Sequence, residues 1–198
     1  MISAVQEDAF VESKTAPPLV VRKAAMRDIR PILRLINDYA ALGLMLPRTE
    51  FELSEAIRDF TVVTSGNDLL GCGALHFYSP TLAEIRSLAV REEAKTHGVG
   101  RKLVEALLAE AEHYELDAVF AFTYVVEFFR KVGFQPVERG ALPLKAWKDC
   151  LRCPKFQSCD EVAVLRILRP DHWAEALPEI WAPSPDDRLI AIPVPRVP

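Results

Sequence analysis

A turn with two closely spaced glycines joins a strand-like apolar run over 83–90 to a helical pattern. Gly98 and Gly100 permit unusual backbone dihedrals and leave the neighbouring amides uncovered. Apolar residues then recur at every fourth position and predict the buried face of a helix that begins near Gly98: Val99, Leu103, Leu107 and Ala111. Free amides and the helix dipole at such an N-terminus attract anions. We therefore expect a diphosphate to bind at this turn.

The charges around this turn also favour a phosphate ligand. Cations outnumber carboxylates, the cations being Arg91, Lys95, Arg101 and Lys102 and the carboxylates Glu92 and Glu93. Two common nucleotide-binding motifs do not fit the turn. A P-loop needs Ser or Thr after a Gly-Lys pair, and the dinucleotide fingerprint needs a third glycine where Leu103 stands. The diphosphate is therefore expected to belong to another kind of ligand.

A cysteine cluster lies toward the C-terminal end of the chain, at Cys150, Cys153 and Cys159. Such a cluster can bind zinc or an iron–sulfur centre, with Asp160 and His172 as candidates for a fourth ligand. The alternative is that reduced thiols help to fix a loop. We favour this alternative, so no metal is expected.

Composition indicates one soluble domain. The chain has 198 residues, of which 50% are hydrophobic, and this is enough apolar material for a full core. A net charge of −4 argues against nucleic-acid binding, and no apolar run reaches membrane-spanning length. Neither a signal peptide nor a secreted disulfide framework is evident, so we expect a cytoplasmic protein. The expected parts are a flexible tail over 1–18, one domain over 19–168 and a Pro- and Trp-containing extension over 169–198.

Periodicity predicts an alternation of strands and helices within the domain. Strands are expected over 19–25, 60–64, 69–78, 83–90, 118–122, 134–139 and 162–168. The first helix is expected to begin at Asp28 as N-cap and to end at Gly43, and Thr49 with Glu52 predicts a capping box for the second. Further helices are expected after Gly98 and over 125–132. This order gives an α/β domain with a mixed sheet.

The turn, written Lys95-Thr96-His97-Gly98-Val99-Gly100, resembles the pyrophosphate loop of the GNAT acetyltransferases. Lys95 stands where that superfamily usually has Gln or Arg, and it keeps the cation. The closer resemblance is to the acetyltransferase domain of the N-acetylglutamate synthases, and it runs from Leu19 to about Leu168. The segments that carry it are 46–49, 71–75, 83–90, 120–123, 127–129 and 142–143. It implies the GNAT acyl-CoA N-acyltransferase fold as a single domain, in a short form without the amino-acid-kinase domain.

The resemblance implies transfer of an acetyl group from acetyl-CoA to the α-amino group of L-glutamate, the first step of arginine biosynthesis. A base must deprotonate the ammonium, and Glu84 matches the family's glutamate in this role. Glu84 stands on a largely apolar strand, where burial raises a carboxylate's affinity for a proton; an ion pair with Arg86 is the alternative interpretation. For the acid that protonates the thiolate, Thr123 matches by position and Tyr124 is the better acid chemically. We favour Thr123, although both hydroxyls could simply satisfy local backbone groups.

Binding residues follow from the same resemblance. Acetyl-CoA is expected to contact the central strand, the turn and a nearby helix, at Leu88, Ala89, Val90, Lys95, His97, Gly98, Val99, Gly100, Arg101 and Phe128. A backbone amide at a bulge within Leu88–Val90 is expected to bind the carbonyl oxygen of the acetyl group. Arg48 is expected to bind one carboxylate of glutamate, Arg86 and Lys155 are candidates for the second, and Ser87 is expected to be a minor contact of the acceptor site.

Two other functions stay open at this point. The same fold could acetylate a different amino acid, a small amine or a protein N-terminus. A non-catalytic CoA-binding or metal-sensing protein is the alternative of another class. The expected partner is a small molecule, with neither nucleic acid nor membrane involved, and a homodimer is left open.

Overall fold

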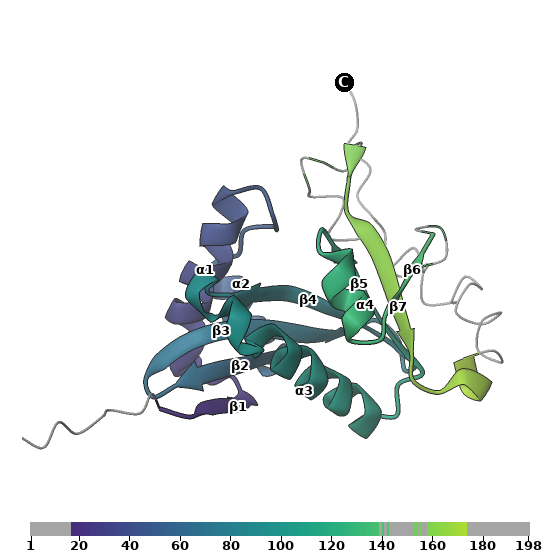
Figure 1. Cartoon of the computed structure of the whole chain (residues 1–198), viewed down its shortest axis with the longest axis horizontal. Helices are drawn as coiled ribbons and strands as arrows, with labels where there is room; N and C mark the ends of the chain where they lie inside the picture. The colour runs from purple at the N-terminus through teal and green to yellow at the C-terminus, as the bar shows by residue number, and fades with distance from the viewer. Residues whose placement is uncertain are drawn as a thin grey trace, which may run out of the picture.

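The computed structural model describes residues 17–138, 140, 142, 153, 155 and 158–173. They form a seven-stranded sheet in the order β1-β2-β3-β4-β5-β7-β6, with helices on both faces (Figure 1). The strands are β1 (Leu19–Lys23), β2 (Phe60–Ser65), β3 (Asp68–Phe77), β4 (Leu82–Val90), β5 (Ala118–Thr123), β6 (Gln135–Val137) and β7 (Val162–Ile167). The helices are α1 (Ile29–Ala41), α2 (Glu50–Ala56), α3 (Val99–His113) and α4 (Val126–Lys131), with short 3₁₀ helices η1 (Met26–Asp28), η2 (Ile57–Asp59) and η3 (Glu92–His97). The predicted mixed sheet is confirmed.

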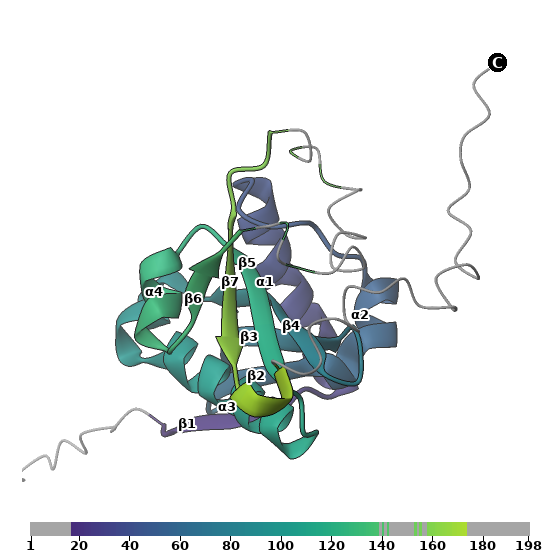
Figure 2. The same cartoon turned by 90° about the vertical axis from the view of Figure 1, so that its right-hand side faces the viewer.

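The sheet has two antiparallel parts that meet at β4 and β5. Strands β1 to β4 pair antiparallel in chain order, and β7 pairs antiparallel with both β5 and β6. Strands β4 and β5 pair in parallel over a short stretch, from Leu82–Ala118 to Glu84–Phe120. Both strands then continue without pairing to each other, and in Figure 2 β5 and β7 stand in front of β4. Glu84 therefore marks the point where the sheet opens.

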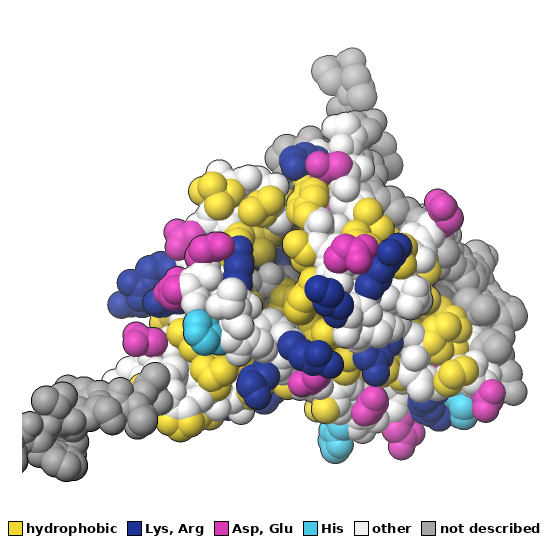
Figure 3. All heavy atoms as spheres, viewed as in Figure 1, with side chains coloured by type: hydrophobic (Ala, Val, Ile, Leu, Met, Phe, Trp, Pro, Cys, Tyr) yellow, Lys and Arg dark blue, Asp and Glu magenta, His cyan; other side chains and the backbone are white. Residues whose placement is uncertain are grey.

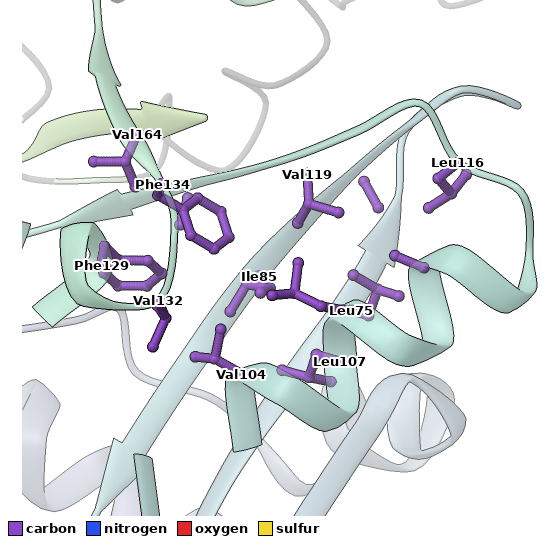
Figure 4. Close-up of a cluster of buried hydrophobic side chains, with 14 residues drawn as sticks. Leu75, Ile85, Val104, Leu107, Leu116, Val119, Phe129, Val132, Phe134 and Val164 are labelled. Carbon is purple, nitrogen blue, oxygen red and sulfur yellow. The ribbon is translucent and has the colours of Figure 1, made fainter. Parts of the chain in front are cut away.

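Buried side chains lie on both faces of the sheet, because neighbouring residues of a strand point to opposite sides. Helices α3 and α4 cover one face (Figure 4), where the buried residues include Leu75, Ile85, Val104, Leu107, Phe129 and Phe134. Helices α1 and α2 cover the other face, where they include Ile32, Ile36, Leu53, Cys72 and Ala74. The residues predicted as the inner face of α3 are all fully buried: Val99, Leu103, Leu107 and Ala111.

Most of the predicted local signals are confirmed. The Glu52 N–H donates to Thr49 Oγ1 at 3.2 Å and the Thr49 N–H to Glu52 Oε2 at 2.8 Å, which is the predicted capping box. Gly43 follows α1 with a φ of 71°, the left-handed conformation that ends many helices. The β2–β3 hairpin closes with Ser65 opposite Asp68, between the strands expected over 60–64 and 69–78.

Two details differ from the expectations. Asp28 stands at the N-cap position of α1, but its side chain does not cap the helix. Its carboxylate accepts hydrogen bonds from the Arg22 guanidinium at 2.6 and 2.9 Å and from the Ala25 N–H at 2.8 Å. The Arg22 hydrogen bond holds the pKa of Asp28 below its usual value. In addition, the segment before the Gly98 turn, expected to be a plain loop, forms η3.

The segment after β7 packs on the body of the domain. Trp173 is buried in a cluster that includes Leu82, Phe120 and Leu142. Trp173, which belongs to the extension expected over 169–198, thus packs against the domain. Trp181 lies outside the described residues.

Candidate active site

A cavity of about 560 Å³ lies between the parts of β4 and β5 that do not pair with each other. Figure 3 shows this face hollowed between the α1 side and the α4 side, with hydrophobic side chains around the hollow. The predicted site residues that line the cavity are Arg48, Glu84, Arg86, Ser87, Leu88, Ala89, Val90, Lys95, Gly98, Gly100, Arg101, Thr123, Tyr124 and Phe128. The fold therefore gathers almost the whole predicted site around one space.

The glycine turn lies at one end of this cavity and opens α3. Gly98 has a φ of 72°, and a Cβ at this position would meet nothing within 4 Å, so the backbone here is uncovered. Gly100 is packed, since a Cβ there would lie 3.3 Å from Cζ of Phe128 in α4. Helix α3 is 15 residues long and its first N–H groups have no intrahelical partner. The turn has the form of an anion site.

Two of the cations around the turn, Lys95 and Arg101, are already paired with carboxylates. Lys95 Nζ lies 2.5 Å from Glu92 Oε2, and Arg101 Nε lies 2.8 Å from Glu105 Oε1. The hydrogen bond to Glu92 raises the pKa of Lys95 above its usual value. These ion pairs lower the net positive charge around the turn below what the count of cations in the sequence indicated. Exposed pairs of this kind are weak, about 0–1 kcal/mol, so a phosphate can replace the carboxylates.

Tyr39 lines the same end of the cavity and was not among the predicted site residues. Its hydroxyl donates to the Val90 carbonyl at 2.6 Å, and Lys95 Nζ lies 5.4 Å from the centre of its ring. Tyr39 thus connects the end of α1 to the end of β4. Tyr39 lies toward the end of α1, and helical periodicity alone gives no sign of a role at a site.

A bulge in β4 faces the cavity. The β3–β4 register slips here, so that Ser87 and Leu88 together oppose Gly73. Ser87 adopts a φ of 52°, which is uncommon for a residue with a side chain. A Cβ on Gly73 would lie 3.0 Å from Leu88 Cδ1, so a side chain at this position would require Leu88 to shift. The bulge was predicted within Leu88–Val90 and begins one residue earlier, with Leu88 common to both.

Glu84 is buried, with 8% of its surface exposed, at the position where β4 and β5 stop pairing. It lies opposite His76 on β3 and Phe120 on β5. The hydroxyl of Tyr78 donates to Glu84 Oε2 at 3.0 Å. A buried carboxylate therefore lines the cavity with a neutral hydrogen-bond donor beside it, an arrangement suited to a general base.

The two candidate acids differ in their hydrogen bonds. Thr123 is buried, and its Oγ1 accepts from the Val125 N–H at 2.9 Å. Tyr124 donates to Asp160 Oδ1 at 3.0 Å and accepts from Lys155 Nζ at 3.1 Å. Burial is the main cause that raises the pKa of Tyr124. The Tyr124 proton is therefore shared with a carboxylate, whereas the Thr123 oxygen uses only its acceptor capacity in the Val125 contact.

Arg48 reaches the cavity from the loop between α1 and α2. Its backbone is held by Asn37 of α1: the Arg48 N–H donates to Asn37 Oδ1 at 2.9 Å, and Asn37 Nδ2 donates to the Arg48 carbonyl at 3.0 Å. Arg86 and Ser87 line the cavity from β4. The loop and the strand thus bring two cations to the same space as Glu84.

Three predicted residues lie elsewhere. The Val99 side chain is fully buried in a core cluster, His97 is exposed, and neither lines the cavity. Lys155 contacts Tyr124 and Asp160 and does not line the cavity. Because the Val99 side chain faces the core, this residue could contact a ligand only through its backbone.

The cysteine cluster is partly within the described residues. Cys153 and Cys159 are half-buried and line the cavity together with Glu161, and Cys159 Sγ lies 3.8 Å from Glu161 Oε2. Cys150 lies outside the described residues. Among the residues described, no group of three or more His, Cys, Asp and Glu could hold a metal ion. Separately, none of the helices within the described residues is long and apolar enough to cross a membrane.

Comparison with known proteins relates the chain to acetyltransferases. Residues 28–134 match the family model described as the acetyltransferase (GNAT) family. The chain is 41% identical over 148 residues to an uncharacterized N-acetyltransferase from Chlorobaculum tepidum, covering 75% of this chain and 96% of that protein. It is 36% identical over 136 residues to an amino-acid acetyltransferase from Mycobacterium tuberculosis, covering 67% and 78%. The Escherichia coli amino-acid acetyltransferase is 30% identical over 125 residues, which are only 28% of that longer protein.

Solved structures give the same relationship. N-acetylglutamate synthase from Neisseria gonorrhoeae, complexed with coenzyme A and N-acetyl-glutamate, superposes with a TM-score of 0.70 at 26% identity. The superposition covers 78% of this chain and 36% of the synthase. A Mycobacterium tuberculosis protein in complex with CoA superposes with a TM-score of 0.65 at 29% identity, covering 75% of this chain and 99% of that protein.

Proposed function

This chain belongs to the GNAT acetyltransferase family, and from this premise we propose that it acetylates the α-amino group of L-glutamate. It is an N-acetyltransferase that uses acetyl-CoA as the acetyl donor, so the proposal concerns the acceptor. One observation carries it: a single cavity joins the amide turn at Gly98 and Gly100 to the carboxylate of Glu84 and to the cations Arg48 and Arg86. The turn amides suit a diphosphate, Glu84 suits an ammonium group, and Arg48 and Arg86 suit the two carboxylates of the acceptor.

The donor fits the end of the cavity that lies at α3. The uncovered backbone around Gly98 and the N-terminal amides of α3 suit the diphosphate, with Lys95 and Arg101 beside them. The part of β4 after Glu84 does not pair with β5 and offers backbone groups to the pantetheine arm, as an added strand would use them. Bound acetyl-CoA supplies an activated thioester carbonyl beside the β4 bulge.

The chain's own groups then account for the proton transfers. Glu84 accepts a proton from the acceptor ammonium, directly or through a water molecule, and leaves a neutral amine. The amine nitrogen bonds to the thioester carbon as the C–S bond breaks, and the amide of Leu88 stabilises the developing oxyanion by about 3 kcal/mol. The thiolate takes a proton from Thr123, which regains one from the reacting nitrogen. Glu84 returns its proton to solvent, so one proton is released per turnover.

The assignment of the acid follows from the hydrogen bonds. The Tyr124 hydroxyl donates a hydrogen bond to Asp160, and its oxygen accepts one from Lys155. The Thr123 oxygen accepts from the Val125 N–H and still carries its own proton. These contacts support Thr123 as the acid and give Tyr124 and Lys155 a structural role at the cavity wall.

Arg48 and Arg86 are the cations proposed to bind the two carboxylates of glutamate, with Ser87 as a further contact. A guanidinium binds a carboxylate through two parallel hydrogen bonds, which favours glutamate over glutamine. A second candidate acceptor is an amino acid with a larger apolar side chain. The apolar side chains that line the cavity next to Arg48 favour it: Leu44, Met45 and Leu46.

With glutamate as acceptor, the reaction is the first step of arginine biosynthesis, and we propose a cytoplasmic enzyme. We also propose that residues 19–168 form the catalytic domain, with 1–18 and 169–198 as flanking segments.

The test is a thiol-release assay with acetyl-CoA and each of the twenty amino acids. Glutamate is expected to give the highest kcat/KM, and Arg48→Ala is expected to abolish the preference for glutamate over glutamine. Arg34→Ala, which removes an exposed arginine of α1, is the control. Higher activity with an apolar amino acid would select the second candidate. Binding of acetyl-CoA without thiol release for any amine would contradict catalysis.

A further inference from the structure

We infer that Tyr78 is a positioning residue that orients the Glu84 carboxylate and keeps it ionised, and so sets the pH range in which the enzyme works. The inference rests on the proposed role of Glu84 as the base. Its basis is the hydrogen bond of 3.0 Å from Tyr78 Oη to Glu84 Oε2. An ionised carboxylate can only accept, so the tyrosine must be the donor in this contact.

The Tyr78 ring is held in place on two sides. Its centre lies 5.1 Å from that of His76 in an edge-to-face contact and 5.4 Å from that of the fully buried Phe120. His76 is itself held by Asp59, with 3.1 Å between Nδ1 and Oδ2. The Tyr78 N–H donates to the Leu82 carbonyl at 2.9 Å, which fixes the backbone at the β3–β4 turn. The hydroxyl is therefore directed at Glu84 by packing.

Burial and the Tyr78 hydrogen bond act on Glu84 in opposite directions. Burial favours the neutral carboxyl, which cannot accept a proton from the substrate. A hydrogen bond donated to the carboxylate favours the ionised form. Without the Tyr78 hydrogen bond, a larger fraction of Glu84, which has 8% of its surface exposed, would be protonated at neutral pH, and the enzyme would be less active there. The Tyr78 hydroxyl offsets part of the burial effect.

Other polar or charged groups also face Glu84 or share its cavity. His76 lies opposite Glu84 on β3. The residue opposite Glu84 on β5 is Phe120, which carries no charge. The remaining polar or charged groups that line the cavity include Arg48, Arg86, Lys95, Arg101, Thr123, Tyr124 and Glu161. All of them are retained when Tyr78 loses only its hydroxyl. A change in the pH profile of that variant therefore reports the hydroxyl itself.

The experiment compares Tyr78→Phe with the unmodified enzyme in the pH dependence of kcat/KM, which reports ionisations of the free enzyme. We expect the acid limb to move to higher pH by about one unit, the size of one hydrogen bond to a charged group. The plateau at high pH is expected to recover, because Glu84 is ionised there in both proteins. Tyr114→Phe, at the exposed tyrosine that follows α3, is the control and is expected to leave the profile unchanged.

A second measurement separates electrostatics from packing. Fluorotyrosine placed at position 78 is a stronger hydrogen-bond donor of nearly the same shape, so it is expected to move the acid limb to lower pH. Direct titration of Glu84 by carbon-13 NMR in the full chain gives the same comparison without an activity assay. An unchanged acid limb in both variants, or shifts in the same direction, would overturn the inference. If Glu84→Gln keeps full activity, the proposed base is wrong, whatever Tyr78 does.

Discussion

The side-chain amide of Asn37 binds both backbone groups of Arg48. The Arg48 N–H donates to Asn37 Oδ1 at 2.9 Å, and Asn37 Nδ2 donates to the Arg48 carbonyl at 3.0 Å. Asn37 lies on α1, and Arg48 lies on the loop that follows it and reaches the cavity. Two residues further along α1, Tyr39 contacts the Val90 carbonyl and the Lys95 ammonium group. The last turns of α1 thus support both ends of the cavity.

Replacing Asn37 by alanine is expected to weaken binding of the acceptor selectively. The loop would lose two hydrogen bonds worth about 1 kcal/mol each, and Arg48 would no longer be held toward the cavity. We expect KM for glutamate to rise about tenfold, while the Kd of acetyl-CoA stays unchanged. Steady-state kinetics and calorimetry measure the two quantities. Asp38→Ala, at the exposed next position of α1, is the control, and equal effects of both variants on KM would contradict the role of Asn37.

Comparing alanine substitutions at Gly43 and Gly98 tests whether the Gly98 turn binds phosphate. Gly43 and Gly98 have φ values of 71° and 72°, and a Cβ would meet nothing within 4 Å at either. Alanine should therefore cost a similar free energy of unfolding at both, about 1 kcal/mol. Only Gly98→Ala is expected to weaken acetyl-CoA binding, about tenfold or more, because its Cβ would lie beside the amides proposed to bind the diphosphate. Equal calorimetric affinities for the two variants would argue against a phosphate site at the turn.

The cysteines are expected to differ in reactivity. Cys72 is fully buried, and burial raises the pKa of its thiol to about 12. The thiolate is the nucleophile, and only about 10⁻⁵ of this thiol is ionised at neutral pH. Cys153 and Cys159 are half-buried and line the cavity. Iodoacetamide labelling read by mass spectrometry should modify these two and spare Cys72 in the folded protein, and saturating acetyl-CoA should slow their labelling. Labelling of Cys72 at the same rate would contradict its placement in the core.

The ion pair between Arg22 and Asp28 is expected to make stability depend on pH. The Asp28 carboxylate is nearly buried, and the Arg22 hydrogen bond lowers its pKa below the model-peptide value of 3.8. A pKa that is lower in the folded state adds stability above the unfolded value, and this stability is lost as the pH falls through the folded value. Asp28→Asn should cost about 2 kcal/mol in urea unfolding at neutral pH, and progressively less below pH 3.8.

Asp38→Asn is the control for this prediction, because Asp38 is exposed on the same helix. It is expected to change the free energy of unfolding little at any pH. If the free energies of unfolding of Asp28→Asn and the unmodified protein differed by the same amount across the acid range, the carboxylate's charge would not stabilise the fold.

Local chemistry in the sequence determined the elements and much of the site. The spacing of Val99, Leu103 and Leu107 fixed the inner face of α3, because a helix repeats every 3.6 residues whatever it packs against. The capping residues Thr49 and Glu52 fixed the start of α2, since both partners of their hydrogen bonds lie within one turn. Glycines at 98 and 100 indicated uncovered amides before a helix, and the family resemblance assigned Glu84, Arg48 and Thr123.

Tertiary structure decided which groups meet across the chain. Glu84, Arg48 and Tyr124 form hydrogen bonds with Tyr78, Asn37 and Asp160, respectively, and no periodicity connects these pairs. The cavity exists because β4 and β5 stop pairing at Glu84, which depends on how two strands 36 positions apart, at Leu82 and Ala118, are brought together. Contacts between distant segments depend on packing of the whole domain, so a local pattern can supply the residues of a site but not their partners.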